Sequence, residues 1–252
     1  MLYQLFGPYA RKNRYWARAE ARYQKRKTRK MKLLFFLLLM FVFPAIFVVG
    51  VIYGFAKMLG GINFNPDSKA WKDALERLRG RMRSQAAGRL VPWDAEMFSL
   101  LSLNRSVTKQ PGWFNKATEG VISTIYQEPV VAYASQVTGK TGLLIARTSM
   151  QEFIFRMKGR ETEIWADGKP FAILVDNTLL AAGKNNTVLA QLEAPRNENQ
   201  IPVMLGSSTA AAINNPARND LGPNPRAVTL LRPVAGDEET ALLALTLLQV
   251  LK

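Results

Sequence analysis

A long uncharged segment near the start of the chain is the strongest feature of the hydrophobic pattern. Residues 33–55 are almost entirely apolar and carry no charged side chain. A helix over this segment reaches roughly 35 Å at about 1.5 Å per residue, enough for the ~30 Å hydrocarbon core of a bilayer. The pattern predicts a transmembrane helix over residues 33–56. Pro44, in mid-span, removes one backbone hydrogen bond and favours a kink that a neighbouring helix can compensate.

The pattern after the span begins with a second helix. A helix-start signal occupies residues 65–68, and apolar positions recur every three or four residues through residues 69–89. These apolar positions are Trp71, Leu75, Leu78 and Met82. The arginines of the same helix are Arg77, Arg79, Arg81 and Arg83, which spread around it. These arginines either face solvent or form a surface that binds acidic lipid or an acidic partner protein. In the second case Trp71, Arg77 and Arg81 are the expected contacts.

Beyond Pro92 the pattern changes to short β-prone runs separated by turn signals. The runs cover residues 120–126, 129–137, 142–148, 152–157, 162–166, 169–175, 187–192, 201–205 and 227–231. Asp167-Gly168 suits a type I′ hairpin turn because this pair accepts two positive φ angles. Many short strands without intervening helices predict an antiparallel β-barrel or sandwich over residues 92–252.

The last residues predict a buried helix. Residues 237–251 open with three acids and are apolar on every face between Ala241 and Leu251, except at Thr246 and Gln249. The acids complement the positive end of the helix dipole. A helix that is apolar all round must be buried all round, and this one is too short to span a bilayer. We therefore expect the β domain itself to enclose it.

Charge is concentrated before the span and predicts the orientation of the chain. Formal net charge is +15, and residues 1–32 form a basic, helical arm. The arm residues that we expect to contact headgroups or partner subunits are Arg11, Arg14, Trp16, Arg18, Arg22, Lys25, Arg26, Lys27, Arg29, Lys30 and Lys32. Because Lys and Arg collect on the cytoplasmic side, the N-terminus is expected in the cytoplasm and the domain after the span in the periplasm or outside the cell. The span is then a signal anchor of a single-pass protein in the cell membrane. A cytoplasmic domain stays open if the basic helix at residues 69–89 weakens the bias.

The arm also places arginines beside aromatic rings, a combination that could bind nucleic acid. The same residues next to a span determine topology, bind anionic headgroups and place rings at the interface. We therefore expect membrane lipids with anionic headgroups or other membrane protein subunits as partners, and not nucleic acid.

Composition excludes several kinds of chemistry. The chain has no histidine and no cysteine, which removes Ser-His-Asp and Cys-His nucleophiles, His-ligated zinc or haem, and disulfides. Thr138-Gly139-Lys140-Thr141-Gly142 resembles part of a P-loop, but Ala134 stands where the first glycine is needed, so we expect a hairpin turn. We predict no catalytic residue, cofactor or metal. An enzyme that relies on carboxylates or lysine is the remaining catalytic hypothesis.

The order of elements resembles the tubby-like barrel superfamily, which includes tubby C-terminal domains, LURP-one-related proteins and phospholipid scramblases. The resemblance is carried by the strands and turns of residues 152–175 and by the terminal helix from Gly236. It implies a closed barrel around a central C-terminal helix, and a lipid-binding function. In tubby domains a basic pocket binds phosphoinositides, and the resemblance assigns no such pocket to Lys158, Arg160, Lys169 or Lys184. Unlike the scramblases, this chain has its span at the start and lacks cysteine.

Two functional hypotheses follow. The first is a non-catalytic, membrane-anchored accessory subunit of a larger membrane protein complex, for example a respiratory or photosynthetic one. Its span, its basic arm and its outer β domain would stabilise the assembly. The second is a tubby-like or scramblase-like protein that binds or senses phospholipid. The expected parts are the arm (1–32), the span (33–56), a linker with the basic helix (57–91) and the β domain (92–252).

Overall fold

The computed structural model describes residues 22, 24–27, 30–32, 34–43, 46–50, 65–66, 68–86, 90–110, 116–138, 141–183, 187–194, 199–216 and 224–251. The chain divides into two compact units, residues 1–61 and 62–252.

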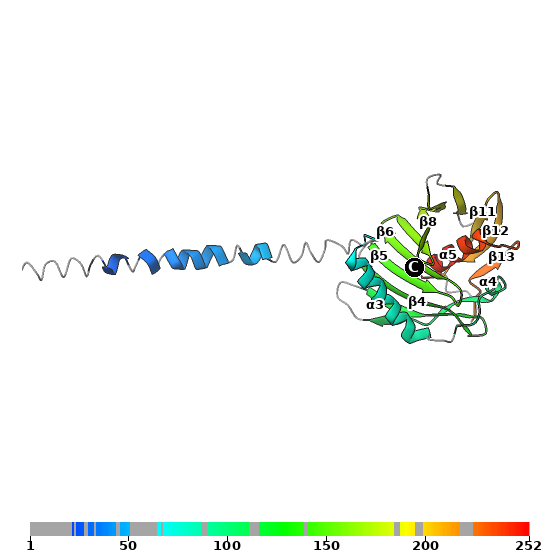
Figure 1. Ribbon diagram of the computed structural model, residues 1–252, viewed down its shortest axis with the longest axis horizontal. Coiled ribbons are helices and arrows are strands. Elements are labelled where there is room, and N and C mark those ends of the chain that lie inside the picture. The colour runs from blue at the N-terminus through cyan, green and yellow to red at the C-terminus, as the bar shows by residue number, and fades with distance from the viewer. Residues whose placement is uncertain are drawn as a thin grey trace, which may run out of the picture. The chain divides into compact units, whose positions relative to one another are not determined.

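The first unit contains one helix that is long and apolar enough to cross a membrane, Gln24–Gly50 (Figure 1). Its apolar side chains lie on its surface, as Phe47 illustrates with 72% of its surface exposed. Residues Leu38–Val42 form a π-helical turn, labelled η1. Such wide turns occur as local insertions in α-helices. Pro44, which was expected to disturb the helix, follows closely in the sequence and lies outside the described residues.

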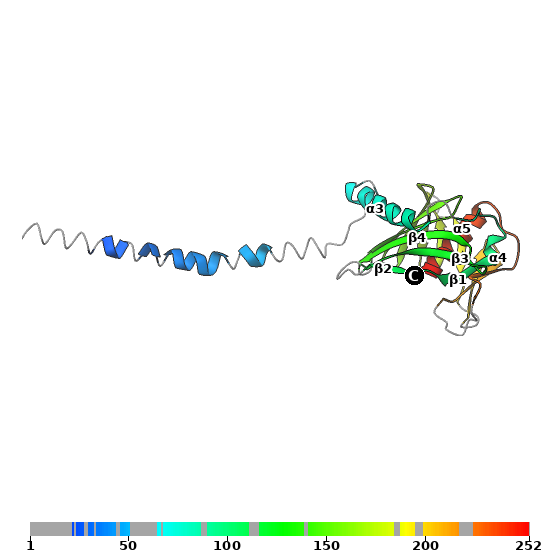
Figure 2. The same ribbon diagram turned by 90° about the horizontal axis from the view of Figure 1, so that it is seen from below.

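The second unit is a nearly closed antiparallel barrel built from one sheet (Figures 1 and 2). Its strands are β1 (Leu101–Arg105), β2 (Thr108–Gln110), β3 (Lys116–Thr124), β4 (Pro129–Thr138), β5 (Thr141–Arg147), β6 (Glu152–Lys158), β7 (Glu161–Ala166), β8 (Lys169–Val175), β9 (Thr178–Ala181), β10 (Val188–Leu192), β11 (Gln200–Leu205), β12 (Ser208–Asn214) and β13 (Val228–Leu230). From β3 to β13 each strand pairs with the next in sequence, β1 precedes β3 in the sheet, and β2 lies off this path against β3. Ser102 bridges to Arg226, and the Ala227 amide donates to the Leu101 carbonyl at 2.6 Å, which brings the two edges together. Of the two predicted architectures, barrel or sandwich, the structure has the barrel.

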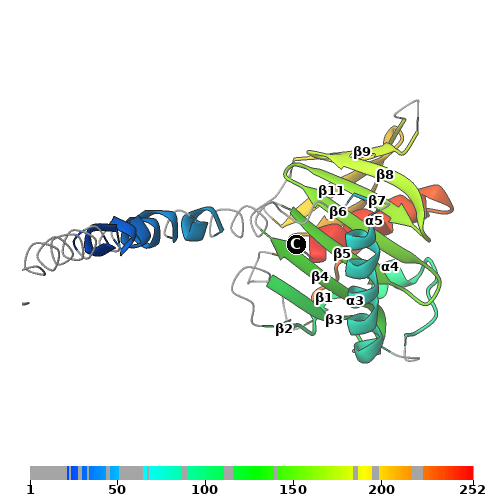
Figure 3. The same ribbon diagram turned by 60° about the vertical axis from the view of Figure 1, so that its left-hand side comes forward.

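The C-terminal helix α5 (Asp237–Leu251) runs through the barrel (Figure 3). Its residues from Ala241 to Leu248 are all buried, with Leu242 and Leu245 fully so. They pack against inward-facing side chains of the strands, for example Phe153 and Phe155. A barrel with more than about eight strands leaves a lumen that strand side chains alone do not fill. The prediction of a helix at 237–251 enclosed by the β domain is confirmed.

Helix α3 (Lys69–Ala86) lies across the outside of the sheet (Figure 3). Its apolar side chains form a second core with the outward-facing side chains of β4, β5 and β6, among them Ala134 and Ile145. Both faces of these three strands are therefore buried, which explains their almost continuous apolar sequences. Trp71 is only 6% exposed and packs against Trp165, with the two ring centroids 5.3 Å apart. The structure thus gives Trp71 a different role from the expected contact with lipid or partner, because its ring is covered by the domain itself.

Turn chemistry fixes the register of the central hairpins. Asp167 and Gly168 have φ values of 50° and 76°, as the predicted type I′ turn requires. Thr138 pairs with Thr141, so the P-loop-like segment is the β4–β5 hairpin connection that was predicted. The strands β1, β2, β9 and β12, together with the short helix α4 (Met97–Leu100), were not predicted. In β12 the run of alanines at 210–212 has low intrinsic strand preference, and pairing with β11 and β13 makes it a strand.

Candidate functional site

The two ends of the barrel differ in the part of α5 that they hold. Helix α5 begins at the end formed by the turns at 148–151 and 167–168, where the Trp93 indole donates to Glu239 at 3.1 Å. We call this the acidic end, after Asp94, Asp167 and Glu239, which line one pocket there. At the opposite end, the mouth, the Arg105 guanidinium donates to the carbonyl oxygen of Val250 in the last turn. Acids at the start of a helix and a guanidinium at its end both complement the macrodipole.

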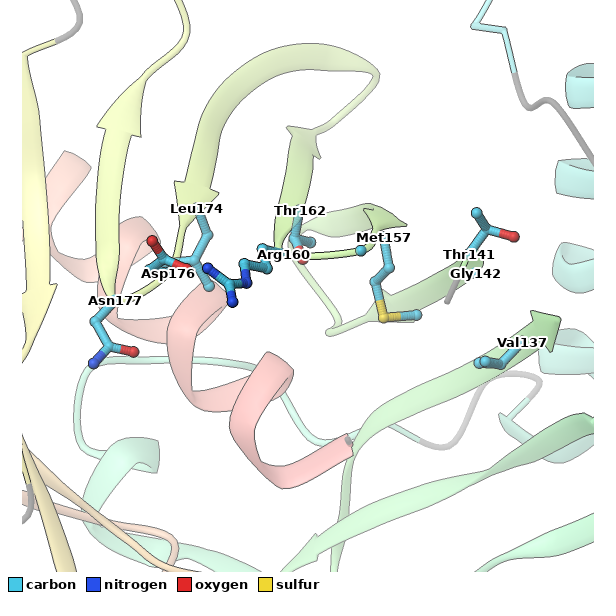
Figure 4. Close-up of a pocket in the computed structure, with 10 residues that line it drawn as sticks. Val137, Thr141, Gly142, Met157, Arg160, Thr162, Leu174, Asp176 and Asn177 are labelled. Carbon is cyan, nitrogen blue, oxygen red and sulfur yellow. The ribbon is translucent and has the colours of Figure 1, made fainter. Parts of the chain in front are cut away.

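A pocket of about 630 Å³ opens at the mouth (Figure 4). The lining residues of this mouth pocket are Val137, Thr141, Gly142, Met157, Gly159, Arg160, Thr162, Leu174, Asp176 and Asn177. They come from the ends of β4, β6 and β8, the starts of β5 and β7, and the turns after β6 and β8. Consecutive antiparallel strands bring these ends together although they are far apart in the sequence. The volume lies in the range of small-molecule sites, about 300–1,000 Å³.

Glycine at position 142 helps to keep this pocket open. A Cβ atom on Gly142 would lie 2.7 Å from the Met157 Cε atom and 3.2 Å from a methyl carbon of Val137. Any side chain at 142 would therefore push Met157 aside. The floor is formed by the apolar side chains of Val137, Met157 and Leu174, with Thr162 between Met157 and Leu174.

The rim of the mouth pocket carries one basic and one acidic side chain, those of Arg160 and Asp176. Arg160 belongs to the turn between β6 and β7, and Asp176 and Asn177 form the turn between β8 and β9. In Figure 4 the guanidinium of Arg160 points towards Asp176. Asp176 has φ 52°, a left-handed conformation that Asp and Asn tolerate in tight turns. The site is thus held by two hairpin turns on a rigid sheet.

The outer wall of the barrel carries charged groups that are already paired. Arg79 of α3 donates to Glu152 of β6 at 2.7 Å and so holds the helix on the sheet. Glu163 accepts from Arg156 at 2.5 Å and from Lys158 at 3.0 Å, and the Arg156 guanidinium lies 5.7 Å from the Trp165 ring centroid. These groups hold α3 and its neighbouring strands together. The carboxylates of Glu152 and Glu163 are already engaged in ion pairs.

The pH dependence of stability tests the Glu163 cluster. Burial raises the pKa of Glu163, but hydrogen bonds from Arg156 and Lys158 outweigh burial, so its pKa lies below the ordinary value of 4.5. A lowered pKa stabilises the folded state above the unfolded-state pKa, and this contribution is lost as pH falls through the folded-state value. We expect wild-type protein to resist urea better than Glu163→Gln near neutral pH, and the difference to shrink as pH falls below 4.5. A difference that does not change with pH would contradict this assignment.

The residues predicted from sequence to contact membrane or partner are spread over both units. Six of the arm residues are helical and exposed: Arg22, Lys25, Arg26, Lys27, Lys30 and Lys32. Arg11, Arg14, Trp16, Arg18, Arg29 and Pro44 lie outside the described residues. On α3, Arg77 is exposed and Arg81 is partly exposed, whereas Trp71 is buried. The structure brings none of these described residues into the mouth pocket.

Sequence reasoning did not find the mouth pocket. From the sequence, Arg160 stood only among the basic residues to which the resemblance assigns no pocket, and Asp176 was interpreted as surface charge. The sequence did contain a signal for it. Each of these two residues lies in a two-residue connection between consecutive antiparallel strands, and alternate connections of such a sheet lie at the same edge. Among the described residues, no group of three or more Asp or Glu is arranged to hold a metal ion.

Comparison of the chain with family models, curated proteins and solved structures found no match.

Proposed function

We propose that this protein is a membrane-anchored accessory subunit whose barrel domain is held at the bilayer by a single N-terminal span. The observation that carries this proposal is the exposed apolar helix Gln24–Gly50 with basic residues at its start. An apolar surface of this length is costly in water and is covered by lipid or by other transmembrane helices. The wide turn at Leu38–Val42 adds an irregular segment of the kind that neighbouring helices accommodate.

The barrel supports the same proposal through its construction. Its interior is filled by α5 and its sheet is covered on one side by α3, so it is a rigid body. Arg77 and Arg83 of α3 are exposed and add positive charge to the surface of this helix. An acidic surface of a partner subunit complements such a basic face.

Co-isolation tests the accessory role. Source membranes are solubilised in a mild detergent, the chain is captured through a C-terminal tag, and the eluate is separated by size. We expect membrane subunits in fixed ratio to this chain. A chain that elutes alone, with phospholipid and no protein, would overturn the accessory role.

The double variant Arg77→Glu with Arg83→Glu tests whether α3 is the contact, because it reverses charge on the exposed surface of this helix. Neither side chain is buried, so the fold should be retained. Loss of the partner subunits from this variant would locate the contact on α3. Retention would leave the span and the arm as the contacts to mutate next.

A second candidate function is phospholipid binding by the barrel. It is favoured by the mouth pocket, which combines an apolar floor with charged and amide groups on its rim. Ligand sites commonly combine apolar surface with a few polar groups that orient the ligand. The resemblance to tubby-like barrels points in the same direction, and the helix-filled barrel agrees with it.

A further inference from the structure

The mouth pocket holds two opposite charges that do not neutralise each other. No ion pair within 4.0 Å joins Arg160 to Asp176, or joins either of them to another described residue. Elsewhere on the barrel some charges are paired, as Lys158 and Glu163 are at 3.0 Å. The two charged groups stand on different turns, and both line the pocket.

This arrangement disfavours a ligand with a single charge. An anion bound to Arg160 would be repelled by Asp176, and a cation bound to Asp176 would be repelled by Arg160. A ligand that carries both charges satisfies both groups. The C-terminal end of α5 lies at the same end of the barrel, and its partial negative charge favours a cationic group there.

The apolar floor narrows the ligand class further. Met157, Leu174 and Val137 offer a surface to hydrocarbon, such as the start of an acyl chain, which a small inorganic ion cannot use. The guanidinium of Arg160 suits phosphate oxygens, and the Asn177 amide can donate a further hydrogen bond.

We propose that the mouth pocket binds the headgroup of a zwitterionic phospholipid, with its phosphate on Arg160, its ammonium on Asp176 and the start of its acyl chains on Met157 and Leu174. This inference rests on phospholipid binding, the second candidate function above. It adds the site, the headgroup class and the residue that recognises each charge.

Calorimetric titration of the full chain in a nonionic detergent tests the proposal. The probes are dihexanoyl phosphatidylethanolamine, the matching phosphatidylglycerol, which has the same phosphate without the ammonium, and glycerophosphoethanolamine, which lacks the acyl chains. We expect the phosphatidylethanolamine to bind most tightly. Weaker binding of glycerophosphoethanolamine would show that the ligand is the lipid and not the free headgroup.

Three variants assign the two charges. Arg160→Ala should weaken phosphatidylethanolamine binding about tenfold, the size of one charge-assisted hydrogen bond. Asp176→Asn should weaken it by a similar factor and leave phosphatidylglycerol binding equal or tighter; asparagine also accepts the left-handed φ at this position. Lys169→Ala, an exposed position in β8 outside the pocket, is the matched control and should bind as wild type does. Partition of the probes into detergent is the same for every variant.

The outcomes separate this inference from the function on which it rests. Equal binding of both lipids, unaffected by Asp176→Asn, would overturn the zwitterion assignment and leave phospholipid binding standing. Tighter binding of glycerophosphoethanolamine than of the lipid would also overturn it. Absence of saturable binding by all three probes would overturn both the inference and the second candidate function.

Discussion

Replacement of Leu245 by aspartate is expected to abolish the folded barrel. Leu245 is fully buried in the middle of α5, where the sheet surrounds it. Loss of a buried leucine side chain costs about 2–5 kcal/mol, and an unpaired buried carboxylate costs several kcal/mol more. That sum is comparable to the whole stability of a typical domain, about 5–15 kcal/mol. Circular dichroism and limited proteolysis of the purified chain would show the loss of β structure.

The matched control for this variant is Leu231→Asp. Leu231 follows β13 and is 59% exposed, so a carboxylate there stays in water and should change stability little. If Leu245→Asp unfolded at the same urea concentration as Leu231→Asp, α5 would not be the core of the barrel.

Two arginines in the apolar helix are expected to release the chain from the membrane. Phe41 and Phe47 are exposed on the helix and lie on either side of its predicted midpoint. Each arginine near the centre of a span costs about 2.5–3.5 kcal/mol on insertion scales, which outweighs the gain from several apolar residues. After carbonate washing, Phe41→Arg with Phe47→Arg should therefore leave the membrane fraction, whereas the wild-type chain should remain in it.

Leu34→Arg serves as the control for the span. This position lies at the edge of the apolar segment, where a long basic side chain can reach the interface at small cost. The control should stay with the membrane. Retention of the double variant in washed membranes would mean that the helix Gln24–Gly50 does not anchor the chain as a transmembrane span.

The parts of the fold that were predicted correctly are those in which burial leaves a local signature. In β8 the predicted and observed bounds, 169–175, agree because turn residues flank an apolar run on both sides. Helix α5 was predicted with its bounds because acids precede a segment that is apolar on every face. By contrast, β9 has four residues and β12 is rich in alanine, so neither contains enough β-prone side chains to stand out.

The mouth pocket could not be predicted in the same way. Its rim charges, Arg160 and Asp176, stand in separate turns, and whether they share a pocket depends on register and on which end of the barrel each turn occupies. The free volume beside Gly142 depends on the position of Met157 in the neighbouring strand. Such relations between strands are absent from a local pattern of side chains.

The sequence by itself determined the apolar helix, the basic segment before it, the β-rich domain and a C-terminal helix that must be enclosed. These features follow from periodicity and composition, because the preference of a side chain for water or for burial is a property of the residue itself and does not depend on the tertiary structure. The tertiary structure decided that the sheet curves around α5, that α3 covers the outside of β4–β6, and that Trp71 faces the sheet. It also decided that two distant turns frame one pocket, because antiparallel pairing sets the distances between residues that the sequence keeps apart.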